Sequence, residues 1–457
     1  MMRASAHIEK AGIPTVALVC DGFIGQAQAV AEGLGIPDLP VARVVGHVDT
    51  QDVAELRSNV GETTLPEVIS RLTSALESPR ARPIHGAAEI VVTGDFEEIN
   101  DRFEARGWSD GLPIVPPTTP RVEAFLARVS HSGDHVLGVM KSSGRAATVR
   151  SVAVNGVMAG CRPEHMPILV AIAEVMADPA YGVEHSGDTT SGETQAIVAG
   201  PMVQSLGFNV SDGALRDGHR ANSSVGRFCR LLLRNVGGFE LGRADKSTFG
   251  HTWRVVLAEN DPALRQLGWR GFAEDQGFEA GANVVALLRT TGDTVVGSIY
   301  GKAPEPILRY LSDGLVRQHS WEFIFAAGFA PETNRPLLVL SPMVAGTLSR
   351  AGLSKSEVRE RLFAYARVPA WKVERYLGEW TNLVPGSRTL VELVADGLAP
   401  RVFAESEDPD RLVPVVSSPD HFVIVVSGDP RRSNAMAIGS NGMHGMLTCR
   451  AVRALAE

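Results

Sequence analysis

The feature that most constrains the fold is an alternation of strand-like and helix-like stretches near the N-terminus. Residues 13–20 (IPTVALVC) form a β-branched apolar run that is typical of a buried parallel strand. Residues 24–34 then repeat apolar side chains at helical spacing. A proline-bounded second strand at 36–48 and a helix at 65–77 follow. This order predicts α/β structure with a Rossmann-like parallel sheet.

The predicted N-terminal sheet is too small to stand alone, because a complete doubly wound domain uses more strands. We therefore expect residues 1–78 to form a partial α/β domain whose sheet is completed elsewhere. Prolines and small residues predict a linker at 79–94. The rest, residues 95–457, is expected to be a large mixed α/β domain, with strands at 283–289, 294–301, 335–342 and 421–430. Within it, residues 146–160 predict a strand followed by a turn.

The segment from Gly200 to Asn260, called the central segment below, combines frequent glycines with polar side chains. Glycine permits positive φ, so the pattern predicts tight turns, and functional residues concentrate in such loops. The alternative is a connector whose polar groups satisfy its own backbone. The residues that we expect to bind substrate here are Asn209, Arg220, Asn222, Arg227, Ser247, Thr248 and Asn260. His251 and Glu259 are candidates for general acid–base catalysis.

The clearest helix of the chain lies at 223–238, inside the central segment. Arg227, Arg230 and Arg234 share one of its faces. Such a face can clamp a carboxylate or phosphate bidentately. The alternative is that these arginines are solvated or paired with nearby Asp or Glu side chains.

A second loop rich in small residues, HSGDTTSGE at 185–193, precedes a strand-like run. The backbone N–H groups of such a loop can cradle an anion. We therefore expect Asp188 to be catalytic and Thr189 and Thr190 to bind substrate. Ser427, at the end of the last buried strand, is expected in a similar anion-receiving turn. A P-loop lysine and a GxGxxG pattern are both lacking, so a nucleotide site has no support.

The four cysteines, Cys20, Cys161, Cys229 and Cys449, lie far apart and have no zinc-type spacing. A reduced, cytoplasmic protein is the expected setting. Cys20 ends the first strand just before a helix, where the helix dipole favours a thiolate, so we predict a catalytic role. The alternative is that Cys20 packs as a small apolar residue.

Charge and hydropathy exclude several function classes. The formal net charge is −8 and Lys/Arg runs are at most two residues long, which argues against nucleic acid or an anionic membrane as a partner. We expect neither a transmembrane helix nor a secretory signal. The twelve histidines form no HExxH or HxH pattern, so the sequence predicts no metal site and requires no cofactor.

The N-terminal block also carries a family resemblance, through Glu9, the run Gly12 to Val16, and the segment Gly35 to His47. These features resemble the distal half of the UGSC (seleno)protein family, which is similar to the selenoprotein B subunits of glycine, sarcosine and betaine reductases. That family carries a Cys- or Sec-Gly-Ser-Cys motif upstream of this strand, and the present sequence contains no Cys-Gly-Ser-Cys. The remainder of the chain resembles a large uncharacterised domain that accompanies such proteins.

The resemblance implies a split, hetero-oligomeric enzyme. A second subunit would complete the sheet and supply a thiol or selenol nucleophile, while this chain binds a small polar or anionic substrate. The chemistry implied is reductive C–N or C–S cleavage, or a lyase or sulfur-transfer reaction. Two alternatives stay open. One is a stand-alone metal-dependent hydrolase or lyase that uses His185, His251, Asp188 and Glu259, and the other is a non-catalytic subunit that stabilises its partner.

Overall fold

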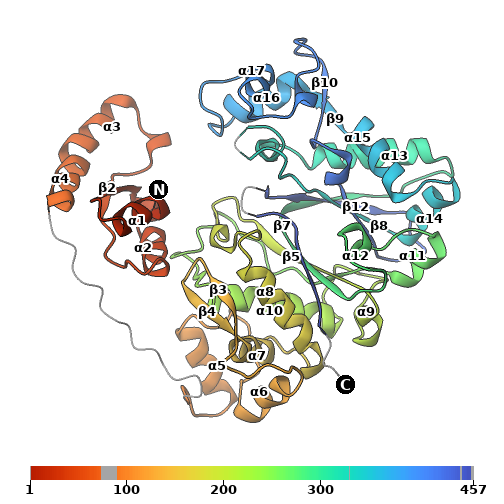
Figure 1. Ribbon diagram of the computed structural model, residues 1–457, viewed down its shortest axis with the longest axis horizontal. Coiled ribbons are helices and arrows are strands. Elements are labelled where there is room, and N and C mark those ends of the chain that lie inside the picture. The colour runs from red at the N-terminus through yellow and green to blue at the C-terminus, as the bar shows by residue number, and fades with distance from the viewer. Residues whose placement is uncertain (1, 74–89, 329, 443–444, 454–457) are drawn as a thin grey trace.

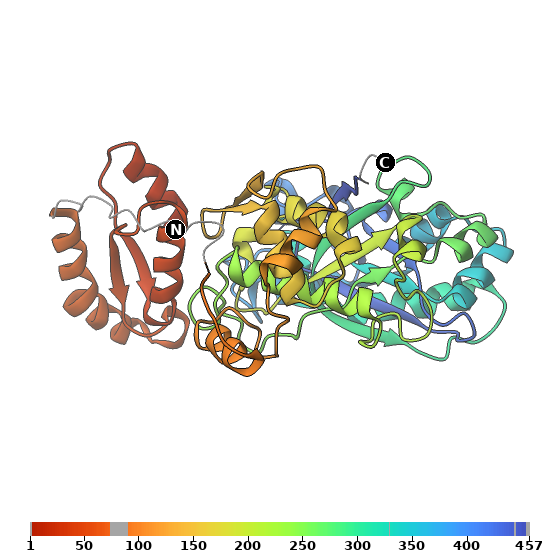
Figure 2. The same ribbon diagram turned by 90° about the horizontal axis from the view of Figure 1, so that it is seen from below.

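The computed structural model describes residues 2–73, 90–328, 330–442 and 445–453. Figures 1 and 2 show residues 2–73, the N-terminal segment, as a small unit beside the remainder, which we call the main body. The linker predicted at 79–94 lies mostly outside the described residues, so its boundaries stay a prediction. Among the described helices, none combines the length and apolar character needed to cross a bilayer.

The N-terminal segment is a two-stranded parallel sheet with helices, as the alternating pattern predicts. Strand β1 pairs with β2 in register from Ala17 opposite Val41 to Cys20 opposite Val44. Ala17 and Val19 pack with Ala27 and Ala31 of the second helix in a small apolar core. The elements are α1 (Met2–Lys10), β1 (Ala17–Cys20), α2 (Ile24–Gly33), β2 (Val41–Val44), α3 (Val53–Asn59) and α4 (Leu65–Thr73).

The main body is organised on one seven-stranded mixed sheet. Its strand order is β11-β8-β12-β7-β5-β6, and β13 pairs with β7 beyond the end of β12. Parallel pairs lie at the two edges, β5 with β6 and β8 with β11, and the pairs between them are antiparallel. The strands are β5 (Glu193–Ala199), β6 (Leu257–Ala258), β7 (Val284–Val296), β8 (Leu337–Leu340), β11 (Val423–Val426), β12 (Ala435–Ser440) and β13 (Thr448–Ala451).

This sheet curls until its edge strands meet. The Asn260 amide, just beyond β6, donates to the Val426 carbonyl at 2.8 Å, and the Ser427 hydroxyl donates to the Ala258 carbonyl at 2.8 Å. The inner face of the curl buries apolar residues such as Ile197 and Ile438 together with Phe272. A curled sheet of this kind leaves little unpaired strand edge.

Two groups of helices cover the outer face of the sheet (Figure 1). Over β5 and β7 pack α7 (Val149–Met158), α8 (Met166–Ala177) and α10 (Arg220–Asn235), flanked by α5 (Phe96–Ala105) and α6 (Thr119–Leu126). Over β8, β11 and β12 pack α13 (Pro304–Arg317), α14 (Pro342–Arg350) and α15 (Lys355–Tyr365), and α16 (Ala370–Gly378) completes their apolar core from beyond these helices. The two sets enclose separate apolar cores on one side of the sheet.

Smaller elements connect these layers. They are β3 (Val136–Met140), β4 (Arg145–Thr148), α9 (Met202–Ser205), α11 (Asp261–Leu267), α12 (Phe272–Asp275), β9 (Arg367–Pro369), α17 (Leu390–Ala395) and β10 (Leu412–Pro414). The predicted α/β class, with a parallel sheet in the N-terminal segment and a large mixed sheet after it, is confirmed.

Two local expectations differ from the structure. The strands predicted at 283–289 and 294–301 are one strand, β7, whose first half pairs with β13 and whose second half pairs with β12. The turn predicted within 146–160 is helix α7. Thr148 caps this helix in a reciprocal capping box with Ser151, and its apolar residues recur at helical spacing.

Candidate functional site

Two loops that the sequence singles out meet at the edge of the main sheet. Residues 186–192 lie between α8 and β5, and residues 245–250 lie in the central segment. The Lys246 amide donates to the Gly187 carbonyl at 2.8 Å, and the Thr248 amide donates to the Thr189 carbonyl at 3.2 Å. The Gly250 amide donates to Ser191 Oγ at 3.0 Å. We call this pair of loops the loop junction.

Ser191 holds a strained backbone conformation at the centre of the loop junction. Its φ is +69°, in the left-handed region that non-glycine residues rarely occupy. Strain of this kind persists only where the surroundings enforce it, and it concentrates at functional sites.

Asp188 ties the loop junction to the end of the sheet. Its Oδ1 accepts from Thr190 Oγ1 at 2.8 Å, and its Oδ2 accepts from Asn441 Nδ2 at 2.8 Å. The backbone N–H of Asn441 in turn donates to the carbonyl of Arg289 in β7 at 2.9 Å. Asp188 is therefore connected, through Asn441, to strand β7, which passes beneath the junction.

Arg289 is the most unusual side chain of this region. It is only 2% exposed, and its three guanidinium nitrogens make no hydrogen bond of good geometry in the described part of the chain. Its charge nevertheless acts on the Tyr181 hydroxyl and the buried Glu193 carboxyl, and it works to lower the pKa of both groups. The guanidinium lies over the Tyr181 ring, 5.2 Å from its centroid. A buried charge without hydrogen bonds is costly, so such a group calls for a partner.

The strand places Arg289 on the helix-covered face, in line with Val285 and Leu287 of the same core. Gly192 lies directly against the arginine stem: a Cβ there would stand 3.0 Å from Cγ and 3.2 Å from Cδ. The Tyr181 hydroxyl is bonded to Thr194 Oγ1 at 2.6 Å. The guanidinium thus faces a ring and a glycine, and an anion is the ligand that its charge and forked geometry favour.

A second arginine lies nearby with acidic partners. Arg230 Nη2 donates to Asp245 Oδ2 at 2.6 Å, and its Nη1 lies 3.8 Å from Glu193 Oε2. Burial raises the pKa of Glu193 despite the attraction of Arg230 and Arg289. Burial acts in the same sense on Asp245, but hydrogen bonds from Ser247 and Arg230 hold the pKa of Asp245 below its ordinary value. Two carboxyl groups in or beside the junction therefore have pKa values shifted in opposite directions, an arrangement suited to proton transfer.

The N-terminal segment packs against this junction. Arg3 of α1 donates from Nη2 to the Glu184 carbonyl at 3.1 Å, and its Nη1 lies 3.4 Å from His185 Nε2. Residues Val183–His185 form the short 3-10 turn η5 that leads into the loop junction.

A second contact lies at the end of α2. Arg243 of the central segment binds both carboxylate oxygens of Glu32, at 2.8 and 2.9 Å. Gly33 fits there because a Cβ would stand 2.3 Å from the Ser142 carbonyl oxygen. The N-terminal segment therefore contacts the same central segment that builds the junction.

Several residues expected to bind substrate lie elsewhere and hold the main body together. Arg227 binds Asp110 through two hydrogen bonds of 2.9 and 2.7 Å. Asn222 is fully buried and bonds to the backbone of Asn209 and Val256. Arg220 donates from Nε to the Gly160 carbonyl at 3.0 Å. Of the predicted binding residues, the structure brings Thr189, Thr190, Ser247 and Thr248 together at the junction.

Glu259, Asn260 and Ser427 meet at a different place, where the edge strands touch. Asn260 caps α11 through the Ala263 amide. Glu259 is fully buried, accepts from the Phe272 amide at 2.6 Å, and lies 3.7 Å from Lys355 Nζ. Burial raises the pKa of Glu259 to about 7, although Lys355 acts to lower it. These three residues support the closure of the sheet.

Cys20 and His251 do not join either group in the contacts of the described residues. Cys20 is half-buried at the end of β1, and His251 is exposed. Within the described ranges, no three His, Cys, Asp or Glu side chains gather as metal ligands would. The four residues of the metal-dependent alternative are thus not assembled into one centre.

Sequence reasoning missed Tyr181, Arg289 and Asn441. The sequence does carry a signal for Arg289. In VVALLR it follows Val285 and Leu287 at every second position, so the three side chains are expected on the same face of a strand. A charge in the register of a buried face predicts a buried arginine. Asn441 and Tyr181 carry no comparable signal.

Comparison with known proteins gives one match. Residues 1–74 match the model of the UGSC family, which confirms the resemblance of the N-terminal segment. The chain matches no curated protein. It also matches no solved structure.

Proposed function

Because residues 1–74 match the UGSC family, we propose that the chain is a subunit of a heteromeric, thiol-dependent enzyme that acts on a small anionic molecule. In this proposal the loop junction binds the substrate. A partner chain with a Cys- or Sec-Gly-Ser-Cys motif docks on the N-terminal segment and supplies the nucleophile.

The observation that carries the proposal is the buried guanidinium of Arg289, whose nitrogens make no hydrogen bond of good geometry within the described residues. A carboxylate or phosphate would satisfy it through two parallel hydrogen bonds. The N-terminal segment contacts the turn that leads into this junction through Arg3. A nucleophile delivered at that segment would therefore approach a substrate whose anionic group is fixed by Arg289.

The surface of the N-terminal segment supports a docked partner. Its sheet has two strands, and Leu18, which alternates with buried Ala17 and Val19 along β1, is 43% exposed. Two-stranded sheets are marginally stable alone, and exposed apolar patches mark interaction sites. The large apolar residues exposed on this small segment are Ile8, Ile13, Leu18, Val48, Val53, Val60, Leu65, Ile69 and Leu72.

The chemistry follows from a thiolate attacking a substrate carbon. A C–S bond forms while a C–N or C–S bond breaks, and the leaving group takes a proton from an acid such as Glu193, whose pKa burial raises. Attack by a second thiol on that sulfur would give a disulfide and release the carbon, which takes a proton to become C–H. The two thiols are oxidised in this reductive cleavage, so an external dithiol must reduce the disulfide before the next turnover. Elimination from the same adduct would give lyase chemistry instead.

The test is co-expression with a Cys- or Sec-Gly-Ser-Cys partner, followed by native mass spectrometry and turnover assays on small carboxylates with amine or thioether leaving groups. We expect a stoichiometric complex that Leu18→Ser weakens about tenfold, because interface anchors contribute more than 1 kcal/mol. Val295→Ser, at a comparably exposed site of the main body, is the control.

Arg289→Met separates the two parts of the proposal. It should abolish turnover while leaving the complex intact. Full turnover in this variant would overturn the substrate site, and failure of any such partner to bind would overturn the subunit assignment.

A further inference from the structure

A second site lies away from the loop junction, in a cavity of about 950 Å³. Its walls come from α5, α6, α7 and the end of α10, together with residues 90–92 and 238–243. The volume is within the range of pockets that bind organic ligands. None of the residues expected to bind substrate lines it, so the proposed function does not use it.

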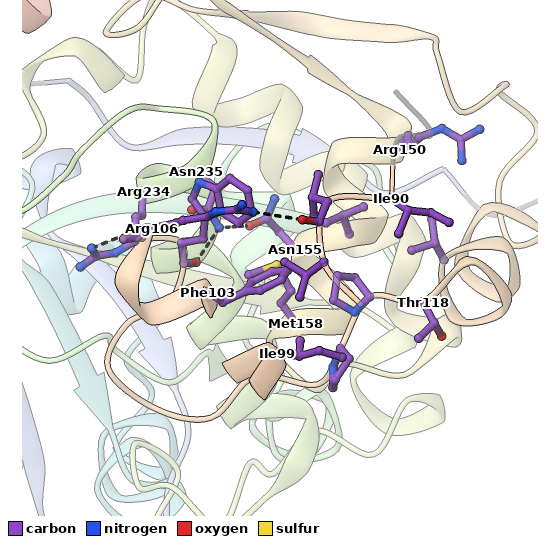
Figure 3. A pocket seen from close by; sticks show the side chains of 18 of the residues that line it. Ile90, Ile99, Phe103, Arg106, Thr118, Arg150, Asn155, Met158, Arg234 and Asn235 are labelled. Carbon is purple, nitrogen blue, oxygen red and sulfur yellow. Dashed lines mark hydrogen bonds between the residues drawn. The ribbon is translucent and has the colours of Figure 1, made fainter. Parts of the chain in front are cut away.

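One end of the cavity is cationic. Arg106, Arg234 and Asn235 are grouped there (Figure 3). Arg234 Nη1 donates to the Gly107 carbonyl at 3.5 Å, and its buried Nε has no partner in the part of the chain that is described. Burial, reinforced by Arg230, lowers the pKa of Arg234. Asn235 Oδ1 is also buried without a partner among these residues.

The cations at this end make contacts to backbone carbonyls and to an aromatic ring. Arg106 donates to the Val91 carbonyl at 3.3 Å and lies over the Trp108 ring, 4.9 Å from its centroid. Arg145, also in the lining, donates to the Asn235 carbonyl at 2.8 Å. Within the described ranges, none of Arg106, Arg145 and Arg234 forms an ion pair with a carboxylate.

The two other lining arginines differ in this respect. Arg150 contacts Glu123 at 3.3 Å and Asp134 at 3.8 Å. Arg243 is held by Glu32 at 2.8 Å. Glu240 also lines the cavity, where it attracts Arg234 and lies 3.8 Å from Arg243. The positive charge that is least neutralised by direct ion pairs therefore concentrates at the Arg106 and Arg234 end.

The rest of the cavity is apolar. Figure 3 shows Ile99, Phe103 and Met158 between the cationic end and the opposite end, where Ile90, Thr118 and Arg150 lie. Phe103 and Met158 belong to the main apolar core, so this wall is firmly packed. A ligand that fills the cavity must present an apolar body to this wall.

We propose that this cavity binds an organic anion with an apolar body, such as an aromatic or medium-chain carboxylate. The carboxylate lies at the cationic end, where it satisfies the guanidinium groups of Arg106 and Arg234. The apolar body lies against Phe103 and Met158. Affinity for this class of ligand requires both parts of the molecule.

Isothermal titration calorimetry on the full chain tests this with three probes. Naphthalene-2-carboxylate carries both parts, 2-naphthalenemethanol carries the apolar body alone, and acetate carries the charge alone. We expect the naphthoate to bind at least about tenfold more tightly than the alcohol, since a hydrogen-bonded charge contributes about 1.5–3 kcal/mol. Acetate should not bind detectably.

Variants locate the charge. Arg106→Gln should weaken naphthoate binding about tenfold and leave binding of the alcohol unchanged. Arg106 is exposed at the end of α5, so this variant is expected to fold. Arg102→Gln is the matched control, because Arg102 is exposed one turn earlier and does not line the cavity. Arg234→Met supplies a second test at the buried cation.

Equal affinities for naphthoate and alcohol would overturn the proposal, as would absence of naphthoate binding. An equal loss of affinity in Arg102→Gln and Arg106→Gln would also overturn it.

Discussion

Replacing Arg289 by methionine should stabilise the main body in the absence of anions. The change keeps a long unbranched side chain beside Gly192 and removes a guanidinium that is 2% exposed and lacks hydrogen bonds within the described chain. Arg289→Met therefore removes a buried charge and leaves an apolar group in its place.

The magnitude follows from two opposing effects. The stacking of Arg289 on Tyr181, at 5.2 Å from the ring centroid, contributes about 2 kcal/mol when desolvated, and this contribution is lost. The desolvation of the buried guanidinium, several kcal/mol, is relieved. The attraction between Arg289 and Glu193 is lost as well, but Glu193 keeps Arg230 at 3.8 Å. Apolar replacement of buried ionic groups is neutral or stabilises by about 1–4 kcal/mol. We expect the free energy of unfolding to rise within that range.

The assay is urea denaturation followed by circular dichroism, with and without acetate or phosphate. Arg359→Met is the control, because Arg359 is a partly buried arginine, 13% exposed at its side chain, that donates to Asp275 at 2.8 Å. That variant should lose about 1–3 kcal/mol by leaving a buried carboxylate less well satisfied. A bound anion at 100 times its Kd should stabilise the wild type by about 2.7 kcal/mol and leave Arg289→Met unchanged.

The outcome that refutes this reasoning is specific. If Arg289→Met is destabilised as much as Arg359→Met, and anions stabilise the wild type and Arg289→Met equally, then Arg289 is a satisfied structural residue.

Three further predictions concern other parts of the molecule. Burial raises the pKa of Glu259 from 4.5 to about 7, so its contribution to stability, on the order of 3 kcal/mol, should be lost as pH rises from about 4.5 to about 7. The difference in urea midpoint between wild type and Glu259→Gln, followed across this pH range, measures the loss. A difference that does not change with pH would contradict the prediction. Gly33→Ala puts a methyl 2.3 Å from the Ser142 carbonyl oxygen. Hydrogen exchange at α2 should then accelerate roughly tenfold or more, as a loss of local stability above about 1.4 kcal/mol implies. The control Gly61→Ala, with no atom within 4 Å of the new methyl, should leave exchange at α2 unchanged. Burial raises the pKa of Cys161 to about 12, so iodoacetamide at pH 8 should alkylate Cys20 before Cys161 in the native protein. Peptide mass spectrometry over time measures the two rates, and equal rates would refute this prediction.

Local sequence patterns predicted elements whose signals are local. The helix predicted at 223–238, which is α10 in the structure, depends on neighbouring residues alone. The strand and helix alternation of the N-terminal segment likewise follows from hydrophobic periodicity. Residues 146–160 show the limit: the sequence predicted a strand followed by a turn there, but the Thr148 cap and burial on the sheet make residues 149–158 a helix.

The candidate site was predictable only in part. The two loops of the junction were identified because glycine and small polar residues cluster in the sequence. Their pairing was not, because it depends on hydrogen bonds between residues far apart in the chain, such as Lys246 and Gly187. The role of Arg227 also depended on a distant residue, Asp110, which converts an exposed-looking cation into a structural ion pair. The cavity lined by Arg106 and Arg234 forms where four helices meet, and no single stretch of sequence marks it.

The strand order of the main sheet has a consequence for synthesis on the ribosome. Strand β12 lies between β8 and β7, yet it is translated after both, and β13 follows it. The curled sheet therefore cannot be completed until residues 423–451 have emerged, and the apolar surfaces of β7 and β8 must wait for it. The N-terminal segment, whose strand pairing and apolar core involve only its own residues, is available much earlier. Nascent chains of this protein should thus expose unpaired strands for most of their translation, a period in which chaperones protect such intermediates.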